Sequence, residues 1–311
     1  MGPEAGRYTA FGAWLRERFD ERVQKIMVDA GLTCPNRDGT VGKGGCIYCN
    51  ARGSGTGAWE RGLSIRDQVI AGRDAVRRRY KARKYLVYFQ SFSNTYAPVD
   101  RLRAIYDEAV TAVDGVVGMS MGTRPDCVDG PVLDLLAEYA SERMVWVEYG
   151  LQSAHDATLR KINRGHDFRC FADAVRQTRK RGMRVCAHVI LGLPGEGPAE
   201  MRATADALAE LGVDGIKLHL LYVVRDTPLE RLYRSGEYRP MAPEAYAEAV
   251  CEFLERTPPD VVVQRLTGDP HPEELVAPEW TLEKRKARNV IFAEMARRDA
   301  WQGKYRRPSP E

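Results

Sequence analysis

The chain has 311 residues, of which 44% are hydrophobic and 29% charged, and its formal net charge is +4. This composition is ordinary for a folded enzyme and excludes a disordered or collagen-like chain. Apolar runs stay below the roughly 18 residues of a membrane-spanning helix, and residues 1–20 lack a secretory signal, so we expect a cytoplasmic protein without membrane contact. Seven cysteines, an odd number, favour metal or redox use over a disulfide framework.

Strand-like and helix-like segments alternate along the first 221 residues. Helices are expected at 64–81, 100–113, 131–139, 156–162, 167–181 and 198–211, and strands at 41–47, 85–89, 116–121, 144–149, 184–191 and 215–221. This alternation is typical of βαβ units and a parallel sheet. About six such units are too few for a closed eight-stranded barrel, so the pattern favours either a partial barrel or an open, doubly wound α/β sheet.

Three parts of the chain are expected. Residues 1–30 form an N-terminal extension, residues 31–225 the α/β barrel, and residues 226–311 a C-terminal extension. The last part carries a strand candidate at 261–266 and ends in a basic helix, 282–298.

Basic residues concentrate in two stretches. Residues 281–311 hold nine basic and four acidic side chains, and residues 73–84 hold seven basic and one acidic. Such patches suit a polyanion such as RNA, and they equally suit the solvated face of a helix.

The most specific chemical signal is a loop with three cysteines, Cys34, Cys46 and Cys49, in a stretch rich in glycine. The Cys46–Cys49 spacing lets two thiolates approach one metal or cluster, and the glycines let the backbone fold tightly around it. A structural zinc site closes with four protein ligands. Three thiolates therefore favour a [4Fe–4S] cluster with one open iron, while zinc with a distant fourth ligand remains the alternative.

Further motifs stand where strands are expected to end, and together with the cysteine loop they resemble the radical S-adenosylmethionine (SAM) superfamily. They are VDAG at 28–31, YFQSF at 88–92, TRPDC at 123–127, EYGLQS at 148–153, NRGH at 163–166, GLPGE at 192–196 and WQGK at 301–304. The eleven residues between Cys34 and Cys46 depart from the three-residue gap usual in that superfamily. The wide gap resembles the YhcC-type branch, which is related to the Elongator catalytic subunit and, more distantly, to oxygen-independent coproporphyrinogen oxidase.

The resemblance implies a partial (β/α)6 barrel, a [4Fe–4S] cluster held by Cys34, Cys46 and Cys49, and SAM chelated to the open iron. One electron would then cleave the sulfonium and release a 5′-deoxyadenosyl radical. The protein supplies orientation, polar contacts and exclusion of water.

Ligands of parallel sheets lie at the carboxyl ends of the strands, and this places several candidate SAM contacts. Side chains at the end of the second strand are expected to accept hydrogen bonds from the SAM amino group: Gln90, Ser91, Ser93 and Asn94. Gln90 and Asn94 have an alternative role as caps of the strand end.

Two further SAM contacts come from the spacing of Gln152 and Arg164. An amide suits a ribose hydroxyl and a guanidinium suits a carboxylate, and the resemblance implies these two roles. Arg164 has an alternative role as a cap on the carbonyls of the 156–162 helix.

The remaining cofactor candidates are Tyr48 and Ile190, both beside adenine, and His188. His188 stands where relatives carry an acidic ribose ligand, so its role is open.

Catalytic candidates are Glu148, Lys217, His219 and Cys127. Glu148 needs a partner if buried, and Lys217 or Arg124 would supply it. Lys217 and His219 alternate on one strand and share a face, where a substrate contact and a hydrogen-bonded core position are both plausible. Cys127 is either a radical-quenching or substrate thiol or a small buried hydrophobe.

The leading functional hypothesis is a radical SAM enzyme that modifies the side chain of a tRNA wobble uridine. Some YhcC-type members are similar to MnmL-like enzymes, which process the 5-carboxymethylaminomethyl group of that base. The partners would be tRNA and an electron donor such as flavodoxin or ferredoxin. Two alternatives remain: a radical SAM enzyme acting on a small molecule or tetrapyrrole, and a zinc-stabilised RNA-binding adaptor without catalysis.

Overall fold

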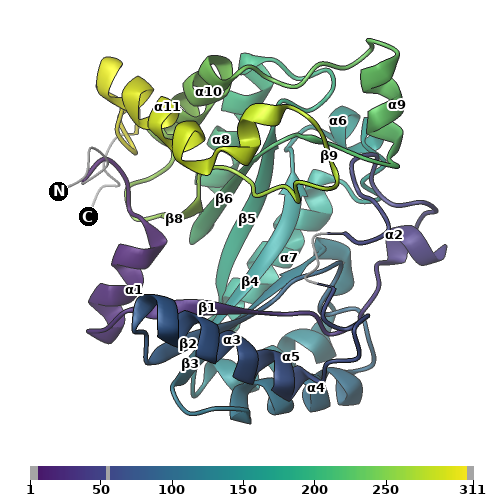
Figure 1. Ribbon diagram of the computed structural model, residues 1–311, viewed down its shortest axis with the longest axis vertical. Helices are drawn as coiled ribbons and strands as arrows, with labels where there is room; N and C mark the ends of the chain where they lie inside the picture. The colour runs from purple at the N-terminus through teal and green to yellow at the C-terminus, as the bar shows by residue number, and fades with distance from the viewer. Residues whose placement is uncertain (1–5, 54–56, 307–311) are drawn as a thin grey trace.

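The computed structural model describes residues 6–53 and 57–306 and contains one large parallel sheet that curls into a half-barrel (Figure 1). Seven strands follow one another in the order β1-β2-β3-β4-β5-β6-β8, and each pairs in parallel with its neighbour. They are β1 (Val23–Val28), β2 (Lys84–Phe89), β3 (Val116–Thr123), β4 (Met144–Gln152), β5 (Arg184–Leu191), β6 (Gly215–Leu220) and β8 (Val262–Arg265). A small antiparallel pair, β7 (Val223–Val224) and β9 (Leu275–Ala277), lies outside this sheet.

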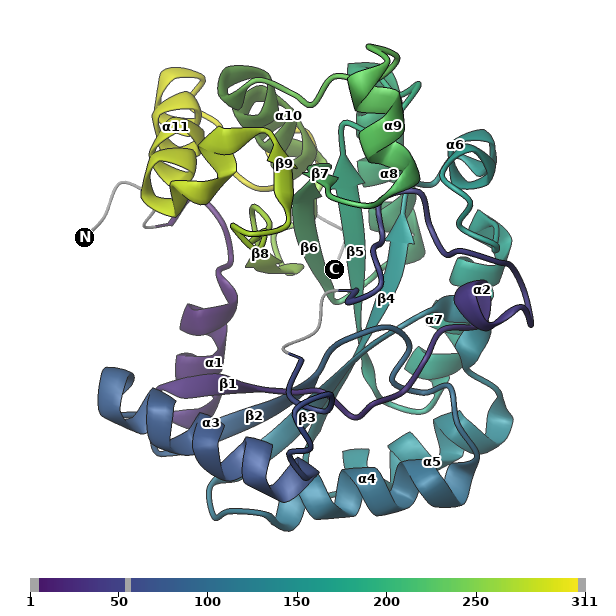
Figure 2. The same ribbon diagram turned by 45° about the vertical axis from the view of Figure 1, so that its right-hand side comes forward.

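The helices cover the convex side of the sheet or lie around its ends. They are α1 (Phe11–Phe19), α2 (Pro35–Asp38), α3 (Ile65–Tyr80), α4 (Val99–Thr111), α5 (Gly130–Ala140), α6 (Asp156–Lys161), α7 (Phe168–Lys180), α8 (Pro198–Leu211), α9 (Pro228–Arg234), α10 (Pro243–Arg256) and α11 (Lys284–Arg297), with 3-10 turns at Pro125–Cys127 and Glu279–Leu282. Figures 1 and 2 show α3, α4 and α5 beside β1 to β3, and α8, α10 and α11 beside β6 and β8. No helix among the described residues combines the length and apolar character needed to cross a membrane.

Side-chain caps start several of these helices. Ser64, Asp129 and Asp167 each accept a hydrogen bond from a backbone N–H in the first turn of α3, α5 and α7. Each cap satisfies a donor that has no partner inside the helix. The capped helices begin close to the predicted positions. Together, the parallel strand order and the covering helices confirm the expected α/β partial barrel.

The prediction of a first strand at 41–47 is wrong. That segment is an irregular part of the cysteine loop, where Gly44 and Gly45 have φ angles of 78° and 80°. Extended strands do not use such angles, which glycine adopts without a steric cost. The first strand is β1, which precedes the cysteines and pairs with β2.

Two strands from outside residues 31–225 complete the sheet. β1 comes from the expected N-terminal extension, and β8 comes from the expected C-terminal layer and pairs with β6. The three-part division of the chain stays a proposal, but the sheet itself needs residues from all three parts.

The amino end of the half-barrel is closed by an aromatic plug. Phe11 and Trp14 of α1 contact Trp146 of β4, with ring centroids 5.8 Å and 5.7 Å from it. The same cluster of buried residues includes Val23 of β1 and Val262 of β8. α1 therefore seals the floor of the barrel interior between the first and the last strand.

Trp146→Ala should lower the free energy of unfolding by about 3 to 5 kcal/mol, because it leaves a cavity under the interior. Trp146 is fully buried, whereas Trp301 is 44% exposed. Trp301→Ala is the matched control and should cost less than about 1 kcal/mol. Urea unfolding followed by circular dichroism measures both, and equal losses would contradict the plug.

Candidate functional site

The three-cysteine loop carries free thiols that receive N–H···S contacts from polar side chains. Asn36 Nδ2 and Arg164 Nη1 lie 3.7 Å and 3.5 Å from Cys46 Sγ, and Arg37 Nη1 lies 3.6 Å from Cys49 Sγ. Burial, and then the proximity of Cys46, raise the pKa of the Cys49 thiol to about 11, and Cys34 contributes in the same direction. Cys46 and Cys34 therefore lie close enough to Cys49 to affect its thiol electrostatically.

The loop is fastened to the segment that follows α6. Ile47 N donates to Ile162 O at 3.1 Å, and Asn163 Nδ2 donates to Gly45 O at 2.7 Å. In a further hydrogen bond between the two segments, Asn36 Nδ2 donates to Asn163 O at 2.6 Å. Asn36 and Asn163 were not predicted as functional residues, although Asn163 stands in the NRGH motif.

Arg164 connects the thiols to β4. Its Nε donates to Gly150 O at 3.1 Å, and its Nη1 points to Cys46 Sγ. A β-carbon on Gly150 would lie 2.7 Å from both Arg164 Nη2 and Gln152 Nε2. The structure thus brings Gln152, Arg164 and Cys46 together, and the guanidinium binds Gly150 and Cys46 rather than capping the carbonyls of α6.

Tyr48 and Ile190 meet in a second apolar cluster beside the loop. Ile190 is buried, and Tyr48 packs against the same group together with Ile47. Burial, and then Cys46, raise the pKa of the Tyr48 phenol well above its usual range. The two residues predicted near adenine therefore lie close together, and their roles stay predictions.

The carboxyl ends of β2 and β4 hold strained backbone. Ser91, Phe92 and Gln152 have φ angles of 97°, 55° and 81°, which non-glycine residues rarely adopt. Such outliers gather where surrounding structure fixes a functional geometry. Gln90 Nε2 donates to Met27 Sδ at 3.3 Å, so this amide is tied to β1.

Several buried polar atoms near the loop have no partner within the described part of the chain: Asn36 Oδ1, Ser91 Oγ, Ser93 Oγ, Asn94 Oδ1, Arg124 Nη1 and His166 Nε2. Buried polar groups are normally satisfied, so this group of atoms indicates a polar ligand at the site. Three free thiols with N–H donors, beside unpaired polar atoms, fit a thiolate-held cluster with a polar nucleotide next to it.

Glu148 lies at the centre of the barrel interior and uses both carboxylate oxygens. Its Oε1 accepts from Lys25 Nζ at 2.8 Å and from the Ser120 hydroxyl. Its Oε2 accepts from Lys217 Nζ at 2.6 Å and from His188 Nε2 at 2.8 Å. Burial favours the neutral acid, but Lys217 and Lys25 outweigh it and hold the pKa of Glu148 well below its usual range.

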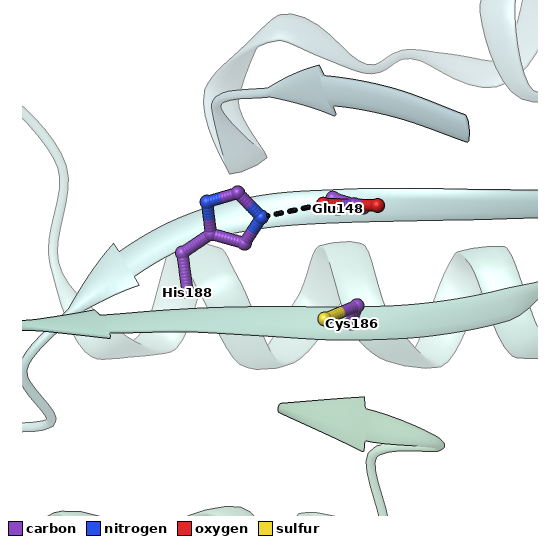
Figure 3. A group of neighbouring side chains, drawn as sticks. All are labelled: Glu148, Cys186 and His188. Carbon is purple, nitrogen blue, oxygen red and sulfur yellow. Dashed lines mark hydrogen bonds and ion pairs between the residues drawn. The ribbon is translucent and has the colours of Figure 1, made fainter. Parts of the chain in front are cut away.

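His188 is a neutral hydrogen-bond donor to this carboxylate. Burial, and then the charge of Lys217, lower the pKa of His188 to about 4, against the opposing influence of Glu148. Since the ionised carboxylate only accepts, Nε2 of His188 carries the proton and Nδ1 keeps its lone pair. Figure 3 shows Nδ1 directed away from Glu148.

Cys186 stands beside Glu148 and His188, and the three ligand atoms lie within 4.8 Å of one another (Figure 3). The chemistry does not suit a metal ion. Glu148 already accepts four hydrogen bonds, and burial, followed by Glu148, raises the pKa of the Cys186 thiol, so the thiolate is disfavoured. A metal would need that thiolate and free carboxylate lone pairs.

The four catalytic candidates fall into two places. Glu148, Lys217 and His219 share the barrel interior, and the ring centroid of His219 lies 5.5 Å from that of His188. Cys127 lies apart, next to Asp126, and burial, followed by Asp126, raises the pKa of its thiol to about 12. Of the two expected partners of Glu148, Lys217 pairs with it, whereas Arg124 pairs with Asp126 at 2.7 Å; the second lysine at Glu148 is Lys25. No sequence pattern had singled out Lys25.

Comparison with known proteins places this geometry in a family. Residues 34–208 match the Radical SAM superfamily, and residues 213–297 match the Radical_SAM C-terminal domain. Protein YhcC of Escherichia coli (strain K12) is 42% identical over 271 residues, which cover 87% of this chain and 86% of that one. Elongator complex protein 3 of Danio rerio is 31% identical over 160 residues, 49% of this chain and 28% of that protein.

The fold has a counterpart among solved structures. Elp3 of the archaeon Methanocaldococcus infernus, with an N-terminal deletion, matches with a TM-score of 0.71 over 90% of this chain and 64% of that one. The identity is 15%, so this likeness concerns the fold.

The chain belongs to the radical SAM superfamily and is an enzyme of that class, with a [4Fe–4S] cluster and SAM as cofactors. The predicted relation to YhcC and to the Elongator subunit is confirmed. The alternative of a zinc-stabilised adaptor without catalysis is wrong, because the superfamily match covers the whole cysteine loop and the sheet from β2 to β5.

Cys46→Ala should leave the reconstituted protein with little iron, because it removes a thiolate that also receives the Arg164 contact. Cys170 of α7 is only partly buried and offers a matched control. Cys170→Ala should keep the wild-type iron and sulfide content. Iron analysis after anaerobic reconstitution measures both, and a fully loaded Cys46→Ala protein would refute the ligand set.

The depressed pKa of His188 predicts a pH effect on stability. The unfolded chain protonates this imidazole below pH 6.5 and the folded one only near pH 4, so unfolding becomes easier as pH falls through that window. His188→Gln should remove about 2 kcal/mol of the loss between pH 7 and pH 5. Urea unfolding of the protein at the two pH values measures it.

The control is His271→Gln, at an exposed histidine. That variant should show the same pH dependence as the wild type. If His188→Gln also left the pH dependence unchanged, His188 would not be held neutral by the fold.

Proposed function

We propose that this radical SAM enzyme modifies the side chain of a tRNA wobble uridine. The observation that carries the chemistry is the three-thiol loop fastened above β4, with Arg164 joining Cys46 to Gly150. The choice of substrate rests on the resemblance to wobble-uridine enzymes of the YhcC-type branch and on the basic surface of the protein.

The ion pairs of the basic side chains indicate which of the two basic stretches is the better candidate for an RNA-binding surface. In the basic C-terminal segment, Arg297 pairs with Glu294 at 2.7 Å, and Arg298 and Lys304 approach Glu255 at 3.4 Å and 3.7 Å. These pairs reduce the net attraction of that segment for phosphate. The tail alone is therefore a weaker argument for RNA than its sequence suggested.

The basic side chains at the carboxyl-terminal end of α3 are less neutralised by acidic partners. Arg77, Arg78 and Lys81 are exposed, and none of them makes an ion pair within residues 6–53 and 57–306. Unpaired guanidinium and ammonium groups attract a phosphate backbone at long range. We therefore propose the end of α3, in preference to the C-terminal helix, as the surface that contacts the polyanion.

When bound, the cluster and SAM would supply one-electron radical chemistry. The protein's own residues do the positioning. Asn36, Arg37 and Arg164 direct N–H groups at the sulfur atoms of Cys46 and Cys49 and so help to orient these two side chains. Gln152 and Arg164 present donors next to Gly150, where they would hold the polar groups of SAM.

The interior below this site is prepared for a polar substrate group. Gly150 stands in register with His188, and Glu148 lies on the same face of β4 two residues earlier. The aromatic plug of α1 seals the other end against water. A substrate group in the interior would thus meet a fixed set of hydrogen-bonding side chains next to the proposed cofactor site.

The proposal is tested by anaerobic reconstitution followed by a 5′-deoxyadenosine assay with dithionite, with and without bulk tRNA, and by comparing modified nucleosides of a deletion strain with wild type. We expect tRNA to stimulate product formation and the deletion to change one wobble nucleoside. An unchanged nucleoside profile would discard tRNA and favour a small molecule or tetrapyrrole. Flavodoxin and ferredoxin are the proposed physiological electron donors.

A further inference from the structure

The last strand of the sheet is irregular where it faces the barrel interior. Val262 and Val263 of β8 pair with Gly215 and Ile216, but the next residue in register, Lys217, pairs with Arg265. Gln264 is skipped, which defines a β-bulge. Bulges re-aim side chains and are enriched beside active sites.

The bulge turns two consecutive side chains toward the interior. Val262 packs in the floor cluster, and Val263 and Leu266 pack in the outer core. Simple alternation would place Gln264 inside and Arg265 outside. Gln264 does lie inside, where its Oε1 accepts from Lys25 Nζ at 2.7 Å. Because of the bulge, Arg265 also takes an inward register position, beside Lys217, which faces the interior.

Gln264 and His219 hold hydrogen-bonding capacity that the described residues do not use. Since Oε1 of Gln264 faces an ammonium group, its other terminal atom is the Nε2 donor, and that atom is buried without a partner in the described part of the chain. Nε2 of His219 is likewise buried and has no hydrogen-bond partner among the described residues. A buried donor without an acceptor lowers stability, so a ligand that accepts from it is favoured.

The surrounding charge is positive. Lys25 and Lys217 pair with Glu148, while Arg265 has Asp269 as its acid partner at 3.8 Å. Asp269 is held more closely by Lys284, at 2.7 Å. Four cations thus surround two carboxylates. Burial, and then the charge of Arg265, hold the pKa of His219 well below its usual range, so this histidine is neutral and does not add charge.

We propose that Gln264, Arg265 and His219 form a subsite for a carboxylate group carried by the substrate. One carboxylate oxygen accepts from Gln264 Nε2 and the other from the Arg265 guanidinium, whose planar fork matches a carboxylate. His219 supplies the remaining donor when its Nε2 is protonated. This inference rests on the proposed function in one respect, that the substrate enters the barrel interior from the cofactor side.

The test compares matched acids and methyl esters as probes of the reconstituted holoprotein with SAM, by anaerobic calorimetry. One pair is 5-carboxymethyluridine and its methyl ester, and the other is N-acetylglycine and its methyl ester, which lacks the nucleoside. The acid should bind at least about tenfold more tightly than the ester, since the ester loses a charge-assisted contact. Equal binding of acid and ester, or no binding of either acid, overturns the proposal.

Three variants sharpen the test. Arg265→Gln should abolish the preference for the acid, and Gln264→Glu should do the same because it keeps the oxygen for Lys25 but replaces the free donor by a charge. Arg176 of α7 is an exposed arginine paired with Asp173, and Arg176→Gln is the matched control that should retain the preference. A preference that persists in Arg265→Gln contradicts the subsite even if that variant is less stable.

The two proposals fail in different ways. A preference for N-acetylglycine over its ester, with no binding of the uridine pair, keeps the carboxylate subsite and removes support for the uridine substrate. Binding of both uridines without a preference keeps the nucleoside and removes the subsite. The iron and sulfide content of Arg265→Gln, measured beside that of the wild type, separates loss of substrate recognition from loss of the cofactors.

Discussion

The half-barrel depends on the burial of one carboxylate. Glu148 is fully buried on the central strand β4, and an uncompensated charge there would cost several kcal/mol. Its partners come from distant strands: Lys25 from β1 and Lys217 from β6. Lys25 also donates to Gln264 of β8, the other edge of the sheet. One cluster of charged and polar side chains therefore joins both edges of the curled sheet, which no strand pairing among the described residues connects.

In this arrangement, distant parts of the chain contribute to one interior. β1 precedes the cysteine loop, and β8 follows it by some two hundred residues, yet both supply side chains to the same interior. α1 connects the two edges from below and excludes water with its aromatic residues. Above, Arg164 links the interior to the thiols through Gly150. Cofactor site and interior are thus neighbours on one strand.

Much of this was readable from the sequence, and the exceptions have physical reasons. Helices with capped ends and continuous apolar strands such as β5 gave clear patterns. β1 was missed because its inward residue Lys25 breaks the apolar run, and that same lysine is what the buried acid needs. The pairing of Glu148 depended on contacts between strands far apart in sequence. The bulge at Gln264 was also hidden, since a register shift leaves no composition signal.

The cysteines and the two polar partners Gln152 and Arg164 were singled out by type and spacing, and the structure brings Cys46, Gln152 and Arg164 together beside Gly150. Asn36 was overlooked, because an amide in a polar loop looks unremarkable until its N–H is seen to point at a sulfur atom. The central claim is that Cys34, Cys46 and Cys49 hold an iron cluster with one iron open to SAM. Mössbauer spectroscopy of ⁵⁷Fe-reconstituted protein tests it most directly. The account predicts that SAM shifts the signal of one iron of four, and four unchanged irons, or a protein that binds zinc in place of iron, would contradict it.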